Sequence, residues 1–252
     1  MFPFSALLDL LCPPICPVCG EIIENSAGKD EPICSTCLQK IVTPAGQFCR
    51  RCGGWQHVVA NDARACPRCR TTEFQFMRAI ALGEYKHDLR LLALRMKTDR
   101  TGVLSIASAK ALAIFRRAEL ESVSANYILP IPMHRLRRWD RGVNAPDLLA
   151  EELGRQLKIP VVRHLVRRIR QTDLQYTLSH KGRVENVAGA FALRAPRFCF
   201  AGTPLAGKNV LLVDDILTTG STCNEVSKIL LAGGVKTVTV AVLARATGTS
   251  QW

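Results

Sequence analysis

Residues 210–222 of this 252-residue chain, VLLVDDILTTGST, hold the side chains best suited to chemistry. Four apolar residues predict a buried strand that delivers Asp214 and Asp215 to its C-terminal end, where open α/β sheets bind their ligands. A turn rich in hydroxyl groups comes next, formed by Thr218, Thr219, Gly220, Ser221 and Thr222. We expect this turn to open a helix that runs to about Ala232.

The turn has the composition of a phosphate site. Backbone N–H groups at the start of a helix attract anions, and the helix dipole adds to that attraction. Gly220 lets the backbone approach a ligand closely, and paired carboxylates accept hydrogen bonds from vicinal diols. The pattern predicts a ribose held by its 2′ and 3′ hydroxyls and its 5′-phosphate. An ordinary strand-to-helix turn is the alternative, whereas the lack of G-x-x-x-x-G-K-[ST] excludes a Walker loop.

All thirteen residues resemble the motif with which type I phosphoribosyltransferases bind 5-phosphoribosyl 1-diphosphate (PRPP). The resemblance implies that Asp214, Asp215 and residues 218–222 hold PRPP, with Mg²⁺ bridging its pyrophosphate and ribose hydroxyls. In the 6-oxopurine branch of that family an aspartate precedes the T-G pair and assists the incoming base, whereas this chain has Thr218 there. The resemblance therefore disfavours purine salvage of that kind and leaves catalysis with another acceptor open.

Eight of the eleven cysteines fall into four C-x-x-C pairs near the N-terminus. The pairs form two near-equal repeats, one with Cys16, Cys19, Cys34 and Cys37 and one with Cys49, Cys52, Cys66 and Cys69. In each repeat the first pair is followed by a glycine, Gly20 or Gly53, which permits a tight knuckle turn. This spacing predicts two sequential Cys₄ sites for structural zinc, with disulfides or redox motifs as the alternatives.

The cysteine-rich segment has few large apolar residues, so we expect two zinc ions to stabilise it. We place a double zinc ribbon in residues 1–72 and a phosphoribosyltransferase-like domain in residues 73–252. Chelation is expected to unfold residues 16–69 and to spare the second domain. Cys12, Cys199 and Cys223 lie outside both repeats and are interpreted as small apolar fillers.

The N-terminal stretch MFPFSALLDLL predicts a short apolar helix that packs on a neighbour through Phe2, Phe4, Leu7, Leu8 and Leu11. It lacks a basic n-region and is too short to span a membrane, and no other stretch reaches that length. We therefore expect a cytoplasmic protein without membrane insertion.

Beyond residue 72, strands and helices alternate, which predicts an α/β fold with a mostly parallel sheet, as in type I phosphoribosyltransferases. Strands are expected at residues 74–85, 127–131, 210–213 and 235–244, with another near Val161. Helices are expected at residues 88–96, 103–119 and 144–158, the last capped by Asn144. Residues 167–187 are polar, basic and weakly periodic, and they predict a long mobile loop.

Two arginine-rich segments match the other parts of a phosphoribosyltransferase. LPIPMHRLRRWDRG, at residues 129–142, takes the place of the pyrophosphate loop, and residues 167–183 take the place of the flexible loop. By this resemblance the catalytic arginines, which stabilise departing pyrophosphate, are Arg135, Arg138, Arg141 and Arg183, with Arg137 beside them. A solvated basic face or a nucleic-acid patch is the alternative interpretation.

Nearly the whole chain resembles the ComF family, also called competence protein F or the GntX-like DNA-utilisation proteins. The resemblance rests on LCPPICPVCG, residues 85–97, PIPMHRLRRWDRGVNAPDLLA and the PRPP motif, with Gln175, Leu178, Ser179, Arg183, Asn186, Val187 and Phe191 between the last two. Family members usually show R-G-F-N-Q where this chain has RGVNA at residues 141–145. The resemblance implies a double zinc ribbon, a phosphoribosyltransferase domain, a role in natural transformation or DNA utilisation, and partners in the DNA-uptake machinery.

Charge points to a second class of function. The formal net charge is +13, and the residues after position 70 carry +12 of it. Two zinc-bound Cys₄ sites lower the total to about +9, which still attracts a phosphate backbone. A phosphoribosyltransferase with an unidentified acceptor therefore stands beside a non-catalytic competence factor that binds single-stranded DNA and keeps a regulatory PRPP site.

The expected DNA surface lies in the two basic segments. Its arginines are Arg135, Arg137, Arg138, Arg141, Arg167, Arg168 and Arg170. Trp139 and Tyr176 lie among them and are candidates for stacking on unpaired bases, although buried packing is the usual role of a lone aromatic side chain.

Overall fold

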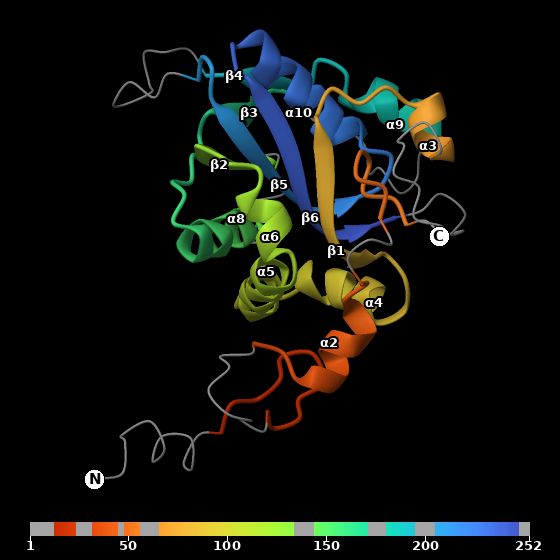
Figure 1. Ribbon diagram of the computed structural model, residues 1–252, viewed down its shortest axis with the longest axis vertical. Coiled ribbons are helices and arrows are strands. Elements are labelled where there is room, and N and C mark those ends of the chain that lie inside the picture. Colours follow the sequence, from red (N-terminus) through yellow and green to blue (C-terminus); the bar gives the residue numbers. More distant parts are fainter. Residues whose placement is uncertain are drawn as a thin grey trace.

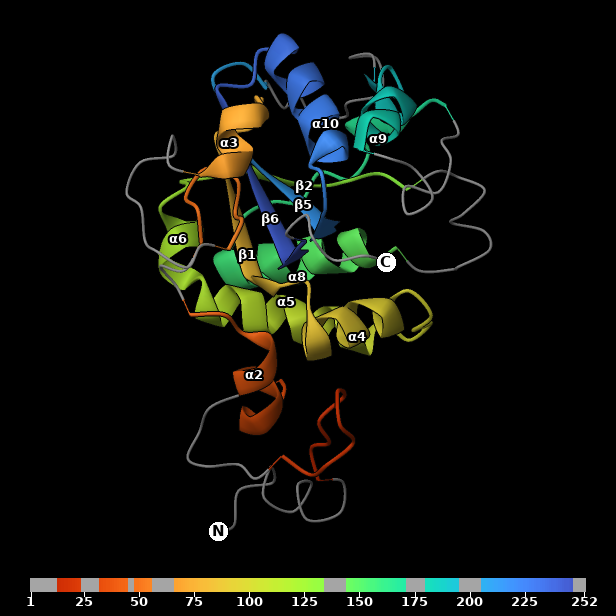
Figure 2. The ribbon, with the colours of Figure 1, turned by 90° about the vertical axis from the view of Figure 1, so that its right-hand side faces the viewer.

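The computed structural model describes residues 13–23, 32–44, 48–55, 66–133, 144–170, 180–194 and 205–246. It has the predicted α/β fold, with helices on both faces of a parallel four-stranded sheet (Figures 1 and 2). The strands, in their order across the sheet, are β1 (Arg78–Glu84), β6 (Thr237–Arg245), β5 (Asn209–Leu217) and β2 (Tyr127–Pro130). Both central strands have long runs of buried residues that face both sides of the sheet, as expected of strands covered by helices on both faces.

Each face of the sheet has its own helices. Three helices, α4 (His87–Met96), α5 (Val103–Phe115) and α8 (Ala145–Leu157), cover one face, and α10 (Ser221–Ala232) covers the other (Figure 2). Because successive residues of a strand point to opposite sides, Leu211 and Val213 of β5 pack in the first core and Leu212 packs in the second.

A small antiparallel sheet packs beside α10. Its strands are β3 (Val166–Arg168) and β4 (Phe191–Leu193), and α9 (His180–Val187) comes between them in the chain. The prediction of a long loop over residues 167–187 is therefore wrong at both ends. Val166 and Phe191 are buried in the core beneath α10. That packing stabilises β3 and β4, which are too short to give a periodic sequence pattern.

Several other elements are present with different ends. The helix expected over residues 103–119 is two helices, α5 and α6 (Arg117–Glu121), with a break at Arg116, whose φ of −119° and ψ of 25° are not helical. The Arg116 side chain turns inward and donates to the carbonyl oxygens of Ala81 and Leu82, both at 2.8 Å. β5 runs four residues beyond the predicted strand, and Val161 forms an isolated parallel bridge with Ile128.

The cysteine-rich segments flank the free edge of β1. Within them, α2 (Ser35–Ile41) follows Cys34 and α3 (Pro67–Thr71) follows Cys66. Thr43 N–H donates to the Leu82 carbonyl at 3.2 Å, and Ala79 N–H donates to the Arg51 carbonyl at 3.1 Å. The chain thus covers backbone groups that an open sheet edge leaves unpaired.

The two sets of four cysteines lie against opposite faces of the sheet. Cys16 and Cys37 belong to the core that contains α4, α5 and α8. Cys49, Cys52 and Cys66 belong to the core beneath α10. The boundary that we predict at residue 72 stays a prediction, but the described cysteine-rich residues share their apolar cores with the sheet.

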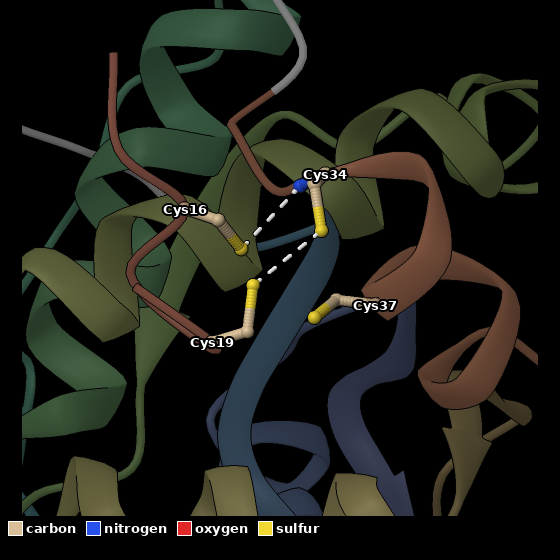
Figure 3. A group of neighbouring side chains, drawn as sticks. All are labelled: Cys16, Cys19, Cys34 and Cys37. Atoms are coloured by element: carbon tan, nitrogen blue, oxygen red, sulfur yellow. Dashed lines mark hydrogen bonds between the residues drawn. The ribbon is translucent and has the colours of Figure 1, made fainter. Parts of the chain in front are cut away.

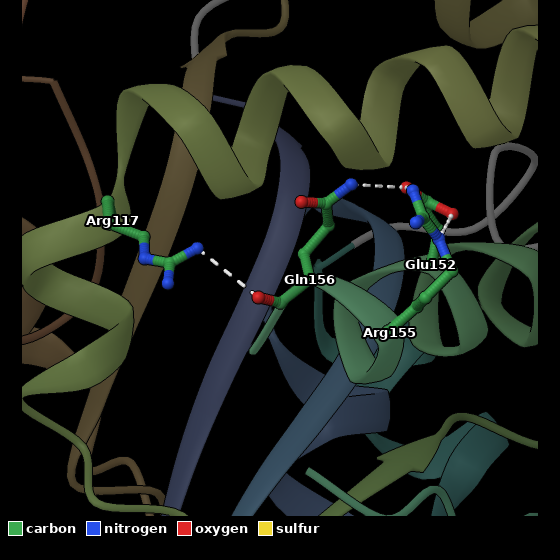
Figure 4. Close-up of polar contacts among 4 residues, drawn as sticks. All are labelled: Arg117, Glu152, Arg155 and Gln156. Carbon is green, nitrogen blue, oxygen red and sulfur yellow. Dashed lines mark hydrogen bonds and ion pairs between the residues drawn. The ribbon is translucent and has the colours of Figure 1, made fainter. Parts of the chain in front are cut away.

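A buried carboxylate accepts hydrogen bonds within α8, on the face of the sheet that α4, α5 and α8 cover. Glu152 of α8 accepts hydrogen bonds from Arg155 Nη2 at 2.7 Å and from Gln156 Nε2 at 2.8 Å (Figure 4). Arg117 Nη1 donates to the Gln156 carbonyl oxygen at 3.2 Å, which ties α6 to α8. Burial by itself raises the pKa of Glu152, but the hydrogen bonds from Arg155 and Gln156 outweigh it and leave that pKa below its ordinary value.

The predicted N-terminal helix lies outside the described residues. Among the helices that the structure describes, none is both long and apolar enough to cross a bilayer.

Candidate functional site

The predicted PRPP motif forms the end of β5 and the turn into α10. Asp214 still pairs with Val242 of β6, and the strand ends at Leu217. Gly220 caps α10 with a φ of 85°, in the left-handed region that favours glycine. A Cβ at this position would lie 3.0 Å from the Phe74 ring. Backbone conformation and close packing thus both favour glycine here.

Hydrogen bonds within the turn hold its hydroxyl groups together. Thr219 Oγ1 lies 2.9 Å from Ser221 Oγ and accepts a bond from Ser221 N–H at 3.3 Å. One small pocket at this turn is lined by Asp214, Thr218, Gly220, Ser221, Thr222 and three flanking residues. The structure therefore brings most of the predicted phosphate-site residues to one place, at the N-terminus of α10.

The two carboxylates lie on different sides of β5, because consecutive residues of an extended strand alternate. Asp214 faces α10, where Cys223 Sγ lies 3.8 Å from Asp214 Oδ2. Burial and the nearby Asp215 charge raise the pKa of Asp214 well above its ordinary value. Cys223 is 1% exposed and fills the second core, as predicted, but it also contacts this carboxylate.

Tyr85 is a site residue that the motif did not identify. It follows β1 directly, so it lies at the same edge of the sheet as the end of β5, and its N–H donates to the Arg245 carbonyl at 2.9 Å. Burial raises the pKa of Tyr85, the Arg90 charge lowers it, and the Asp215 charge raises it again. Asp215 therefore shares its side of the sheet with a phenol and a guanidinium.

Two arginines outside the motif donate hydrogen bonds to backbone carbonyls of the turn. Arg245, at the end of β6, is fully buried, and its Nη1 donates to the carbonyl oxygens of Leu217, at 2.6 Å, and of Thr218. Arg68 of α3 donates from Nη1 to the same Thr218 carbonyl at 2.9 Å. Burial and the nearby Arg68 charge lower the pKa of Arg245 to about 10. Sequence reasoning missed both, because nothing in a lone arginine reveals which distant carbonyl it meets.

The eight cysteines form the two predicted Cys₄ clusters, and in each the four Sγ atoms lie within 4.8 Å of one another. Figure 3 shows Cys16, Cys19, Cys34 and Cys37 converging on one centre. Sγ atoms lie 3.7 Å apart between Cys19 and Cys34 in the first cluster, and between Cys49 and Cys69 in the second. Tetrahedral zinc with Zn–S bonds of about 2.3 Å requires edges of about 3.8 Å. Both clusters therefore fit structural zinc.

The knuckle turns repeat closely. Gly20 N–H donates to the Cys16 carbonyl at 2.8 Å, and Gly53 N–H donates to the Cys49 carbonyl at 2.9 Å. Both glycines have positive φ, of 86° and 65°. Burial and the Cys49 charge raise the pKa of Cys69 to about 12. Four thiolates this close together would repel one another, and a metal of charge +2 at each centre would relieve that repulsion.

The remaining predicted residues are only partly covered. Arg135, Arg137, Arg138, Arg141, Trp139 and Tyr176 lie outside the described residues, and Arg183 lies on α9 with a side chain that is not described. Arg167 is exposed on β3, whereas Arg168 lies over the Phe191 ring at 5.4 Å. Arg170 donates to the carbonyls of Asn186 and Ala188, both at 2.9 Å.

Comparisons with known proteins agree with this architecture. The phosphoribosyl transferase domain model matches residues 148–251, and the double zinc ribbon domain model matches residues 7–70. Competence protein F of Haemophilus influenzae is 34% identical over 224 residues, which cover 85% of this chain and 90% of that protein. The chain belongs to the ComF family. This confirms the family and fold class that the sequence predicts.

Two further ComF-family relatives match most of their own length. DNA utilization protein YhgH of Salmonella typhimurium is 30% identical over 216 residues, covering 84% of this chain and 90% of the relative. Competence protein ComFC of Bacillus subtilis is 26% identical over 211 residues, covering 81% of this chain and 80% of the relative. The likeness therefore spans both the cysteine-rich segment and the sheet.

Proposed function

We propose that this ComF-family protein binds PRPP together with Mg²⁺ at the turn between β5 and α10. The observation that carries the proposal is the joint geometry of the turn. Asp214 and Asp215 lie near the end of β5, and the hydroxyl groups of Thr219 and Ser221 lie 2.9 Å apart where α10 begins. The helix N-terminus suits the 5′-phosphate. The two carboxylates lie on different sides of β5 near its end, and both can accept hydrogen bonds from ribose hydroxyls.

The raised pKa of Asp214 also supports a cation at this site. Two carboxylates in close sequence repel each other, and a divalent cation relieves that repulsion. Mg²⁺ prefers oxygen ligands and commonly binds through one or two carboxylates together with substrate phosphates. Asp214 and Asp215 would hold it through their oxygens or through its water shell.

Replacement of both carboxylates tests the PRPP proposal. Asp214→Asn together with Asp215→Asn removes charge-assisted hydrogen bonds worth about 1.5–3 kcal/mol each, so Mg²⁺·PRPP affinity should fall by at least 100-fold. Isothermal titration calorimetry measures this loss, and the exposed Glu73→Gln serves as a control for charge alone. Equal PRPP affinity in the double variant and the parent would refute the assignment.

Whether PRPP is a substrate or an effector is a separate question. As an enzyme, the protein transfers the phosphoribosyl group to an acceptor and releases pyrophosphate, and Arg135, Arg138, Arg141 and Arg183 would stabilise that leaving group. Pyrophosphate release measured across candidate acceptors distinguishes this role from a regulatory one. Release that depends on a particular acceptor supports catalysis, whereas binding without release supports regulation.

We also propose that the protein acts in DNA uptake or utilisation, because its relatives carry the names Competence protein F and DNA utilization protein. The net charge of +13 supports a second activity, the binding of single-stranded DNA, and Arg167 presents an exposed guanidinium on β3. The described N-terminal cysteines form two metal-binding clusters and no disulfides, which supports a cytoplasmic location.

Salt-dependent titration tests the DNA activity. Each phosphate contact on a single strand contributes about 0.7 to the log–log slope, so replacing Arg135, Arg138 and Arg167 with alanine should flatten the slope by about two. If the basic surface adjoins the PRPP site, PRPP should also weaken DNA binding, and DNA should weaken PRPP binding equally. An unchanged slope and affinity would remove this surface from the proposal.

A further inference from the structure

We call residues 217–222, between β5 and α10, the phosphate turn after its proposed ligand. Two guanidinium groups donate hydrogen bonds to its backbone carbonyls. The Leu217 carbonyl accepts a hydrogen bond from Arg245 Nη1 at 2.6 Å, and the Thr218 carbonyl accepts from both Arg245 and Arg68. In a planar trans peptide the C=O bond and the following N–H bond point in opposite directions. The N–H groups of Thr218 and Thr219 therefore point away from the two arginines. This orientation suits an anion on the open side of the turn.

The same two arginines belong to the surroundings of the second Cys₄ cluster (Cys49, Cys52, Cys66 and Cys69). Arg68 lies between Cys66 and Cys69 in the sequence, on α3. Arg245 Nε donates to the Cys52 carbonyl oxygen at 2.8 Å, while Nη1 of the same guanidinium binds the turn. One rigid, planar group thus connects the metal-binding knuckle to the phosphate turn.

Two further contacts join the residues that follow α3 to the start of α10. Gln75 N–H donates to Asn224 Oδ1 at 2.5 Å, and the Phe74 ring packs against Gly220. The first Cys₄ cluster (Cys16, Cys19, Cys34 and Cys37) has different neighbours, since the carbonyl oxygens of Pro17 and Val18 accept bonds from Arg95 of α4, on the other face of the sheet.

We propose that the second Cys₄ cluster, and not the first, sets the geometry of the phosphate turn through Arg68 and Arg245, so that its metal and the bound ligand stabilise each other. Arg68 and Arg245 are positioning residues in this scheme, because they hold the carbonyls that orient the binding N–H groups. The inference rests on the proposed PRPP site and extends it to the zinc ribbon. Thermodynamic linkage requires the effect to be mutual.

Three single variants separate this coupling from a general loss of charge or stability. Arg68→Ala removes the bond to the turn. Arg70→Ala removes an equal charge from an exposed position on the same helix, and Arg95→Ala loosens the first cluster. We expect Mg²⁺·PRPP affinity, measured by calorimetry on zinc-loaded full-length protein, to fall about tenfold in Arg68→Ala and less than twofold in the other two.

Hydrogen exchange measured by mass spectrometry gives a second readout. Saturating Mg²⁺·PRPP should slow amide exchange in residues 48–55 and 66–71 and leave residues 13–23 and 32–41 unchanged. Equal PRPP affinity in Arg68→Ala and Arg70→Ala would overturn the proposal, and so would equal slowing in both cysteine-rich segments.

The coupling between the second Cys₄ cluster and the turn can be tested even if PRPP does not bind to the protein. Absence of binding to the parent protein would refute the proposed function by itself. Exchange of residues 217–222 in the ligand-free protein then tests the coupling alone. Faster exchange in Arg68→Ala than in Arg70→Ala supports the coupling, whereas equal rates in the two variants overturn it.

Discussion

Asp214 combines a cost to the fold with a proposed role in binding. Its carboxylate lies beside the buried Cys223 thiol and next to Asp215 in sequence, and burial raises its pKa well above the ordinary value. A carboxyl group with a raised folded-state pKa binds more protons in the folded state than in the unfolded state. Stability is therefore lost as pH rises from the unfolded pKa, about 3.9, towards the folded pKa. The raised pKa of Asp214 therefore makes the ligand-free protein less stable at neutral pH than an ordinary pKa would.

The single variant Asp214→Asn tests whether Asp214 lowers the stability of the fold while it contributes to ligand binding. Removal of this titratable carboxyl group should raise the free energy of unfolding of the ligand-free protein by about 1 kcal/mol at pH 7 and weaken Mg²⁺·PRPP binding. Urea denaturation at pH 5 and pH 7 measures the first effect, which should be larger at pH 7. A variant that is less stable than the parent at both values would contradict the raised pKa.

Among the elements, α5 depends on a cap from the preceding turn. Asp99 Oδ1 accepts from Thr101 N–H at 2.9 Å and from Gly102 N–H at 3.2 Å, and Oδ2 accepts from Leu104 N–H at 2.9 Å. These amides have no partner within the helix, so the carboxylate satisfies groups that a helix start leaves free. Burial alone raises the pKa of Asp99, but the hydrogen bonds outweigh it and hold that pKa below its ordinary value.

Asp99→Ala should therefore lower the free energy of unfolding by about 1 kcal/mol at pH 7. For a lowered folded-state pKa, the stabilisation is present above the unfolded pKa of about 3.9 and disappears as pH falls through the folded pKa. The difference between parent and variant should thus shrink in acid. Denaturant titrations from pH 7 to pH 3 measure it, with the exposed Glu73→Ala as control. A constant difference across this range would exclude the carboxylate as its source.

At the scale of the whole molecule, the two metal clusters belong to the two cores of one sheet. Ile33 and Cys37 pack with Leu89 of α4 in the first core, whereas Cys52 and Phe76 pack in the second. A Cβ on Gly83 of β1 would lie 2.2 Å from the Ile41 carbonyl oxygen, so the cysteine-rich segment and the sheet are in direct contact. Because of this packing, we now expect chelation to destabilise the sheet, whereas the sequence alone led us to expect that chelation spares it.

Metal removal tests the point. Elemental analysis should find two zinc ions per reduced chain, and complete chelation should lower the free energy of unfolding of the sheet by several kcal/mol, because both cores lose packing groups. Calorimetry of the zinc-loaded and stripped proteins, followed by zinc re-addition, measures the loss and its recovery. A sheet that melts at the same temperature without zinc would show that the ribbons are independent of it.

Features that depend on local spacing could be predicted from the order of residues alone. Paired cysteines three residues apart predict a metal knuckle, and an apolar run before Asp214 predicts a buried strand that leads into a hydroxyl-rich turn. The family followed from the order of such motifs. Each of these inferences needs residues that are neighbours in the chain.

Features that depend on contacts between residues far apart in the chain became known only from the fold. It gave β3 and β4 their pairing, split the predicted long helix at Arg116, and placed the two cysteine clusters on opposite faces of the sheet. It also brought Arg68 and Arg245, 177 positions apart in the chain, onto the Thr218 carbonyl in the turn between β5 and α10. An arginine carries no sequence signal for the carbonyl that it will meet, because that partner is chosen by the packing of the whole fold.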